Sequence, residues 1–128
     1  MSVSESVLIV DDDDLLARMA AFYLTQAGYS ARVVQGGAAA LLDLTEQPSD
    51  LVLMDIRMPG MDGVEALRRL RKAGHAMPVV MMTHDNRADV IRDVLALGGN
   101  GYLLKPFEGP ELVARVRKAL DAAKVARR

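Results

Sequence analysis

Short runs of apolar residues alternate along the chain with longer segments in which apolar residues recur at helical spacing. Each run has four residues or fewer and is almost entirely apolar, as expected for strands that are covered on both faces in a parallel sheet. Turn-forming residues, chiefly Gly, Pro, Asn and Asp, bound the runs. The predicted strands are Val7–Val10, Ala31–Val34, Leu51–Met54, Val79–Met82 and Tyr102–Leu104.

The segments after these strands are predicted to be helices. The first is rich in Ala and Leu, lacks Gly and Pro, and is followed by Gly28, a common helix stop. The third has an apolar face and a basic face of Arg68, Arg69, Arg71 and Lys72, which we expect to be solvated. Strand and helix alternate five times, which favours one parallel sheet with helices on both faces. The predicted helices are Leu15–Ala27, Ala38–Glu46, Val64–Ala73, Asn86–Leu97 and a last helix with Pro110 in its first turn.

Length and composition indicate one ordinary globular domain. The chain has 128 residues, of which 51% are hydrophobic and 26% charged, and its net charge of -1 gives no strong field to attract nucleic acid. It has no cysteine, which excludes disulfides and thiol catalysis, and no run approaches the ~20 apolar residues of a membrane span. Without a secretory leader at its start, we expect a cytoplasmic protein with a domain over 1–123 and a basic tail or linker start over 124–128.

Polar side chains follow four of the five predicted strands. Asp11 and Asp12 follow the first strand, Asp55 the third, Thr83 the fourth and Lys105 the fifth. In a right-handed parallel sheet these ends lie on one edge, so the residues should converge. A pair of carboxylates at ~4 Å costs about 1 kcal/mol in water and about 4 kcal/mol at an intermediate dielectric. Oxygen ligands of this kind suit Mg²⁺, and with an ammonium and a hydroxyl beside them they form a site suited to phosphoryl transfer.

Each of these residues also has an ordinary structural interpretation. Aspartates after a strand often cap the next helix, and we assign Asp13 and Asp14 to that role. Taken singly, Lys105 would be a surface lysine and Asp55 a turn residue. Only their combination in one predicted cluster favours a functional site.

Four motifs, in this order and spacing, resemble those of the receiver domain of two-component response regulators. They are VLIVDD from Val7, LVLMDIRMPGMDG from Leu51, VVMMT from Val79 and GYLLKPF from Gly101, and the resemblance runs to about Leu120. It implies a single flavodoxin-like doubly wound α/β domain, similar to the chemotaxis regulator, with five helices and a five-stranded parallel sheet of order 2-1-3-4-5. It also implies a regulatory domain that assists its own phosphorylation and dephosphorylation but is not otherwise an enzyme.

The resemblance gives each clustered residue a role. Asp55 would accept a phosphoryl group from a phosphohistidine on a histidine kinase or histidine phosphotransfer protein, or from a small phosphodonor. Mg²⁺, with Mn²⁺ as a substitute, would be bound directly by Asp12 and Asp55, partly through water by Asp11, and by the backbone carbonyl of Arg57. Lys105 would pair with Asp55 and then with the phosphoryl group.

The resemblance also implies a switch made of Thr83 and Tyr102. Thr83 would move to hydrogen-bond a phosphoryl oxygen, and Tyr102 would turn inward as Thr83 leaves its resting place. The Lys105-Pro106 bond is cis in the family, which would aim Lys105 into the site. The surface of the fourth helix, fifth strand and fifth helix would change, and it would serve a homodimer, an output domain or a target protein.

Three positions near the site are individual to this chain. Arg57 and Asp85 lie two residues beyond Asp55 and Thr83 and are oppositely charged, so we expect them to pair across the site mouth and slow dephosphorylation. His84 stands where the family mostly has a small residue, and its ring would hinder the movement of Thr83 or access to Asp55.

The first predicted helix carries few polar residues. If Leu16, Ala20 and Leu24 face the sheet, Leu15 or Phe22 stays near the surface. We expect this helix to bind the kinase or phosphotransfer partner, because the family tends to use this face.

Other functions fit less of the sequence. An aspartyl-phosphate phosphatase of the haloacid dehalogenase type would use Asp11 as its nucleophile, but no acidic pair follows Lys105 and the loop after Asp55 would have no purpose. A pseudo-receiver that only binds partners would be expected to lack the acidic residues or the lysine. A flavin site is excluded because the loop after the first strand is anionic, whereas a bound phosphate needs amide donors.

Overall fold

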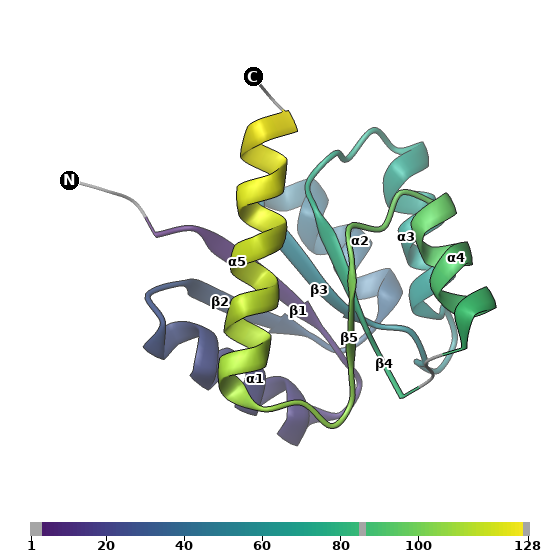
Figure 1. Ribbon diagram of the computed structural model, residues 1–128. Helices are drawn as coiled ribbons and strands as arrows, with labels where there is room; N and C mark the ends of the chain where they lie inside the picture. The colour runs from purple at the N-terminus through teal and green to yellow at the C-terminus, as the bar shows by residue number, and fades with distance from the viewer. Residues whose placement is uncertain (1–3, 85–86, 127–128) are drawn as a thin grey trace.

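The computed structural model describes residues 4–84 and 87–126, and in these residues five strands alternate with five helices (Figure 1). Every predicted element is present, with ends within two residues of the prediction, although the predicted helix start at Asn86 lies outside the described residues. The strands are β1 (Ser6–Val10), β2 (Ser30–Val34), β3 (Leu51–Asp55), β4 (Val79–Thr83) and β5 (Tyr102–Leu104). The helices are α1 (Asp14–Gln26), α2 (Gly37–Glu46), α3 (Gly63–Lys72), α4 (Ala88–Ala96) and α5 (Gly109–Ala126).

The five strands form one parallel sheet in the order β2-β1-β3-β4-β5. This order confirms the flavodoxin-like arrangement implied by the sequence motifs. The chain runs from β1 to one side for β2 and then crosses to the other side for β3, so β1 and β3 lie next to each other. Val10 pairs with Met54, which brings the residues after β1 beside the end of β3.

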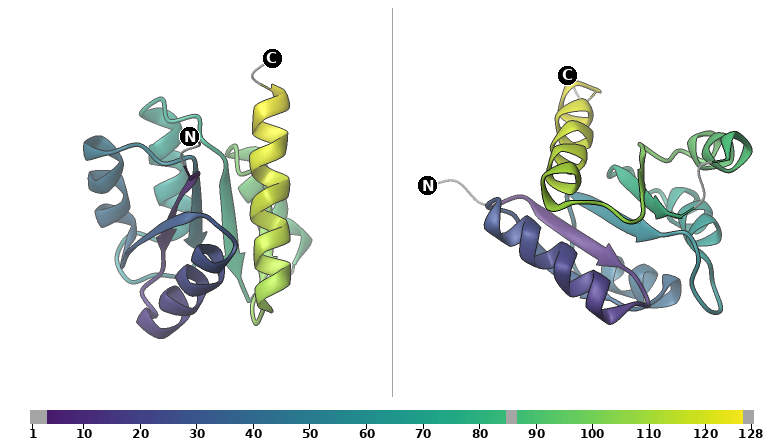
Figure 2. Two further views of the ribbon diagram at one scale, coloured as in Figure 1. Left: turned by 90° about the vertical axis from the view of Figure 1, so that its left-hand side faces the viewer. Right: turned by 60° about the horizontal axis from the view of Figure 1, so that its bottom comes forward.

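Helices cover both faces of the sheet (Figure 2). Alternate residues of each strand point to opposite faces, so Val7 and Ile9 pack with α1 and α5 while Leu8 and Val10 pack with α2 and α3. The central strands β3 and β4 are buried along their whole length, which explains their continuous apolar sequence.

Aspartates cap two of the helices. The carboxylate of Asp13 accepts a hydrogen bond from the amide of Leu16 at 3.2 Å, and that of Asp62 accepts one from the amide of Glu65 at 2.8 Å. Both side chains satisfy amides that have no partner inside their own helix. The capping role predicted for Asp13 is therefore confirmed, while Asp14 lies within the first turn of α1.

Two expectations from the sequence were wrong in detail. In α1 the fully buried positions are Ala17, Ala20 and Leu24, whereas Leu16 is only half-buried. Arg71 of α3 is half-buried and hydrogen-bonded to backbone carbonyls instead of lying on a solvated face, and this burial lowers its pKa. Apolar spacing alone does not reveal which long polar side chain will find acceptors in a distant loop.

The last helix extends past the predicted end of the domain. Residues 124–126 belong to α5, so the division between a domain and a following segment stays a prediction. Among the helices of residues 4–84 and 87–126, none is both long enough and apolar enough to cross a bilayer.

Candidate functional site

Polar residues from four parallel strands meet at the carboxyl edge of the sheet. Asp11 directly follows β1, Asp55 ends β3, Thr83 ends β4 and Lys105 directly follows β5. Asp11, Asp55 and Thr83 are buried, although their side chains are polar. The sheet thus gathers at one point the residues that the sequence analysis selected.

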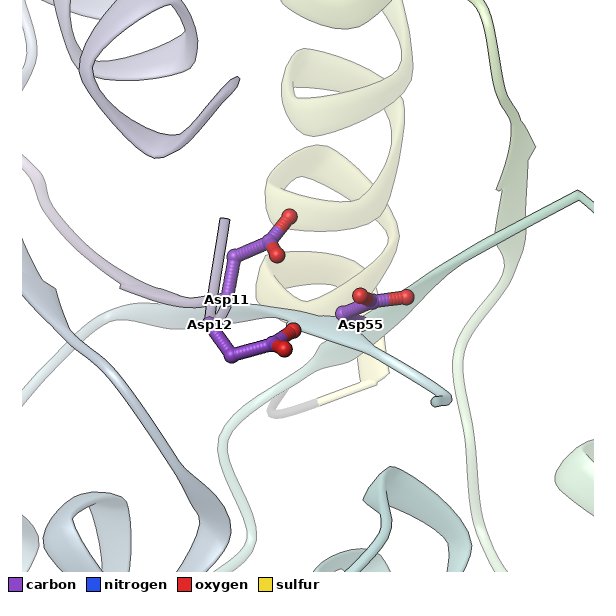
Figure 3. Close-up of side chains that lie close together, drawn as sticks. All are labelled: Asp11, Asp12 and Asp55. Carbon is purple, nitrogen blue, oxygen red and sulfur yellow. The ribbon is translucent and has the colours of Figure 1, made fainter. Parts of the chain in front are cut away.

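Three carboxylates form the centre of this cluster. One oxygen from each of Asp11, Asp12 and Asp55 can be chosen so that the three lie within 4.8 Å of one another (Figure 3). Asp11 and Asp55 are buried, whereas Asp12 is exposed. The arrangement therefore offers oxygen ligands to a cation that approaches from solvent.

The ammonium of Lys105 lies between two of these carboxylates. Its Nζ is 3.0 Å from Oδ2 of Asp11 and 3.2 Å from Oδ2 of Asp55. The side chains of Lys105 and Asp11 are 5% and 0% exposed, so water screens these ion pairs little. Asp11 also accepts a hydrogen bond from the amide of Asp13 at 2.9 Å.

Burial raises the pKa of Asp55 above its ordinary value. The Lys105 ammonium lowers this pKa because it favours the ionised carboxylate, whereas the neighbouring Asp11 carboxylate raises it. A hydrogen bond from the Arg57 backbone also lowers the pKa of Asp55. Because the pKa remains raised, the positive charge already present does not fully compensate the ionised Asp55. A further cation at this point would be favourable.

Gly63 allows α3 to begin directly against the site. Its amide donates to the carbonyl oxygen of Ile56 at 2.7 Å, which closes the loop after Asp55. A side chain at this position would overlap the backbone carbonyl of Asp55 and the side chain of Met81. No role of its own was predicted for Gly63 from the sequence, because the close approach of the start of α3 to β3 and β4 cannot be read from local sequence.

On the other side of the site, the Lys105-Pro106 peptide bond is cis, as the family resemblance implied. The backbone amide of Lys105 donates to the carbonyl oxygen of Thr83 at 2.8 Å, which joins the end of β5 to the end of β4.

A cleft of about 600 Å³ lies beside the acidic cluster. Thr83 reaches it from β4, and the loop after β3, the start of α3 and one side of α4 form its other walls. The residues that line it are Ile56, Arg57, Met58, Pro59, Asp62, Val64, Thr83, Val90 and Asp93.

The remaining predicted residues surround this centre. Tyr102 is half-buried on β5, and the guanidinium carbon of Arg115 lies 6.0 Å from the centre of its ring. Arg57 and His84 are exposed. Asp85 lies outside the described residues, so its expected pairing with Arg57 stays a prediction.

A profile of the response regulator receiver domain family matches residues 7–117. The chain belongs to this family. Its match extends from β1 into α5 and so includes the acidic cluster, Thr83 and Lys105. The chain is therefore a receiver domain of two-component signalling, a family of regulatory phosphoacceptor domains. The alternative hypothesis, a phosphatase with Asp11 as nucleophile, is not favoured.

Relatives and solved structures agree with this membership. The receiver domain is 41% identical over 116 residues to the sensory transduction protein RegX3 of Mycobacterium tuberculosis. This alignment covers 90% of the present chain and 50% of RegX3. It is 40% identical over 121 residues to the DNA-binding response regulator MtrA of Mycolicibacterium smegmatis, covering 93% of this chain and 52% of MtrA. The chain thus spans about half the length of the curated relatives it matches.

Among solved structures, the chemotaxis response regulator CheY4 of Vibrio cholerae matches with a TM-score of 0.87 and 27% identity. The match covers 91% of the receiver domain and 99% of CheY4. The order of strands and the placement of the helices therefore agree with those of a known regulator along nearly the whole chain.

Proposed function

We propose that Asp55 accepts a phosphoryl group from a histidine kinase or a histidine phosphotransfer protein, and that the domain acts as a switch. The observation that carries this proposal is the Lys105 ammonium, held 3.2 Å from Asp55 and 3.0 Å from Asp11 in nearly complete burial. A buried ammonium beside a carboxylate can neutralise charge that appears on a phosphoryl group bound there.

In the proposed reaction an Asp55 carboxylate oxygen attacks the phosphorus atom. A new O–P bond forms while the P–N bond of the phosphohistidine breaks, and the imidazole nitrogen of the donor keeps the electron pair and takes up a proton. Lys105 then pairs with a phosphoryl oxygen, and the hydroxyl of Thr83 donates a hydrogen bond to another. Hydrolysis of the same O–P bond by water resets the switch, so the domain assists its own phosphorylation and dephosphorylation.

The donor set suits Mg²⁺, with Mn²⁺ as a substitute. Its members are hard oxygens, with no His or Cys, and they carry more negative charge than Lys105 alone offsets. We assign the ligands to Asp11, Asp12, Asp55 and the backbone carbonyl of Arg57. When bound, the ion supplies charge neutralisation for the phosphoryl oxygens.

Phosphorylation would be read out through Thr83 and Tyr102. Thr83 would move toward the phosphoryl group and Tyr102 would turn inward, changing the surface of α4, β5 and α5. That surface would bind a second copy, an output domain or a target protein. MtrA, a relative about twice as long, is named as DNA-binding. The receiver domain itself would not bind nucleic acid, because the net charge of the chain is only -1. It would also not bind a membrane, and it would act in the cytoplasm.

Mass spectrometry after incubation with acetyl phosphate and Mg²⁺ tests the acceptor. The wild-type domain should gain the mass of one phosphoryl group, and Asp55→Asn should gain none. Asp11→Asn should still be labelled because Asp55 remains, but more slowly because one of the assigned metal ligands is lost. Labelling that requires Asp11 but survives Asp55→Asn would overturn the proposal and restore the phosphatase alternative.

The partner would bind at an exposed apolar stripe on α1. Leu15, Met19 and Phe22 are 71%, 44% and 59% exposed and follow one another at helical spacing, which leaves an apolar patch on that helix. Phe22→Asp should slow transfer from the partner kinase by roughly tenfold or more, as expected for loss of an aromatic anchor, with unchanged labelling by acetyl phosphate. Leu42→Asp on α2, where Leu42 is 62% exposed, is the matched control. Equal transfer rates for Phe22→Asp and wild type would refute this docking site.

Arg57, His84 and Asp85 would set the lifetime of the phosphorylated state. An Arg57–Asp85 pair would obstruct the attacking water, so Asp85→Ala should shorten the lifetime of phosphorylated Asp55. An unchanged decay rate, followed by mass spectrometry after removal of the donor, would refute the pairing.

A further inference from the structure

The carboxyl-terminal end of α4 is tied to α3 by one side chain, Arg71. Its Nε and Nη2 donate to the carbonyl oxygen of Gly98 at 3.1 and 2.7 Å, and Nη1 donates to those of His75 and Met77, each at 2.9 Å. Nη2 also donates to Oδ1 of Asn100 at 2.9 Å. All five N–H donors of the guanidinium are therefore used, and none of them goes to a carboxylate.

The residues that follow α4 strengthen this attachment. Asn100 joins the loop after α4 to the start of β4. Its side-chain Oδ1 accepts a hydrogen bond from the backbone amide of Val79 at 2.9 Å, and its backbone amide donates one to the Val79 carbonyl oxygen at 2.8 Å. Gly99 lies so close to Val94 that an added Cβ would be 2.5 Å from the Val94 side chain. The carboxyl-terminal end of α4 is thus fixed to both α3 and β4.

The rest of α4 is less deeply buried than this end. Val94, in the last turn of the helix, is its only buried residue in the part of the chain that the structure describes, and Val90 and Ile91 are half-buried. Val90 and Asp93 line the cleft of about 600 Å³ whose opposite walls include Thr83 and Pro59. The side of the helix that carries Val90 and Asp93 therefore borders this cleft, next to the proposed switch residue, and Val90 belongs to its amino-terminal half.

We infer that Arg71 is the pivot of α4, holding its carboxyl-terminal end fixed while its amino-terminal half turns across the cleft when the site changes state. A planar guanidinium with every donor satisfied has little freedom to move, so it can serve as a fixed point. The pivot itself is a property of the resting protein; its use in signalling rests on the proposed function, because the displacement would start at Thr83.

Hydrogen exchange of the unphosphorylated protein tests the pivot. Arg71→Gln should speed exchange of the amides in α4 and the loop to β5 by about tenfold or more, because several charge-assisted hydrogen bonds are lost there, while exchange in β1 and α5 stays unchanged. Arg71→Lys should have an intermediate effect, since an ammonium cannot make all five bonds. Arg68→Gln is the control, because Arg68 is exposed on the same helix and pairs with Glu65. Unchanged exchange in α4, or equal acceleration along the whole chain, would overturn the pivot.

A thiol placed in the cleft tests the movement. The chain has no cysteine, so Val90→Cys provides a single reporter on α4. Mg²⁺ and beryllofluoride, a mimic of a phosphoryl group on a carboxylate, should change its reactivity by about threefold or more, and Arg71→Gln should remove most of this change while Arg68→Gln preserves it. An equal response with and without Arg71, or no response in the Val90→Cys protein, would overturn the coupling. A response that persists in Asp55→Asn would instead contradict the proposed acceptor, and it would leave the exchange result intact.

Discussion

At Asp55, burial raises the pKa and the neighbouring Asp11 carboxylate raises it further, against the Lys105 ammonium 3.2 Å away and the Arg57 backbone. The folded protein therefore binds a proton at Asp55 more readily than the unfolded chain does. The stability that this proton contributes is fully present below the unfolded-state pKa and is lost as the pH rises through the folded-state pKa. At neutral pH without a divalent ion, the ionised Asp55 lowers stability.

Asp55→Asn, a neutral residue of nearly the same shape, should therefore raise Tm by a few degrees at neutral pH in the absence of divalent ions. The difference from wild type should shrink as the pH falls through the folded-state pKa of Asp55, because the wild-type carboxyl becomes neutral there. Mg²⁺ should raise the Tm of the wild type more than that of the variant. Thermal unfolding followed by circular dichroism over a pH series measures both effects, and a lower Tm for Asp55→Asn at neutral pH would contradict this electrostatic account.

Gly63 shows the second constraint at the scale of a residue. An added Cβ would overlap the backbone carbonyl of Asp55 and approach the backbone of Ile56, neither of which can move without shifting β3 or its loop. Gly63→Ala should cost about 3 kcal/mol of unfolding free energy, measured by urea denaturation. Gly36→Ala is the matched control, because nothing lies within 4 Å of the corresponding Cβ. Equal losses for the two variants would show that close packing at Gly63 is unimportant.

At the scale of elements, the helices are held to the sheet very unevenly. α5 buries Gly109, Leu112, Val116, Ala119 and Leu120, whereas α4 buries only Val94 among its described residues. A weakly buried helix opens locally at little cost, which suits an element that must change position. The uneven burial thus separates a stable scaffold from a movable part.

The edge strand β2 depends on an ion pair as well as on apolar packing. Arg32 of β2 donates to both carboxylate oxygens of Asp43 in α2, at 2.7 to 3.2 Å, and both side chains are mostly buried. Arg32→Gln should cost about 1–3 kcal/mol in urea denaturation, because it leaves the Asp43 charge unpaired. Arg18→Gln should cost no more than about 0.5 kcal/mol, since the Arg18–Asp14 pair is exposed. Similar costs would mean that burial does not strengthen the Arg32 pair.

At the scale of the whole molecule, two apolar layers share one sheet. Val116 of α5 lies in the layer with α1, and Leu67 of α3 lies in the opposite layer. Every β3 residue is buried between these layers, so loss of packing on one face removes support for the other. We therefore expect the domain to unfold in one cooperative step.

Leu67→Ala and Val116→Ala test this expectation from opposite faces. Leu67→Ala should lower the unfolding free energy by about 2–5 kcal/mol and Val116→Ala by somewhat less, because each leaves a cavity in a dense core. Because the chain has no tryptophan, its intrinsic fluorescence comes from tyrosine. This signal reports mainly on the layer that contains Tyr23 and Tyr29. In both variants its transition should coincide with that of far-ultraviolet circular dichroism. A fluorescence transition insensitive to Leu67→Ala would show that the two layers unfold separately.

The sequence predicted the elements and the site well where the information was local. Continuous apolar runs such as Leu51–Met54 indicated buried strands, and the residues after them were the ones that the sheet brings together. The failures concerned side chains whose surroundings come from elsewhere. Ala17 and not Leu16 is fully buried because of how α1 is rotated about its axis against the sheet. The burial of Arg71 depends on a loop 27 residues later in the chain.

The amino-acid sequence by itself determined the alternation of strands and helices, the turns between them and the chemical types at the strand ends, because periodicity and backbone preference act over a few residues. Only the tertiary structure decided that Lys105 lies 3.0 Å from Asp11, 94 residues away, and that a cleft separates α4 from the loop after Asp55. Such distances follow from the packing of whole layers, in which the position of each side chain depends on all its neighbours at once.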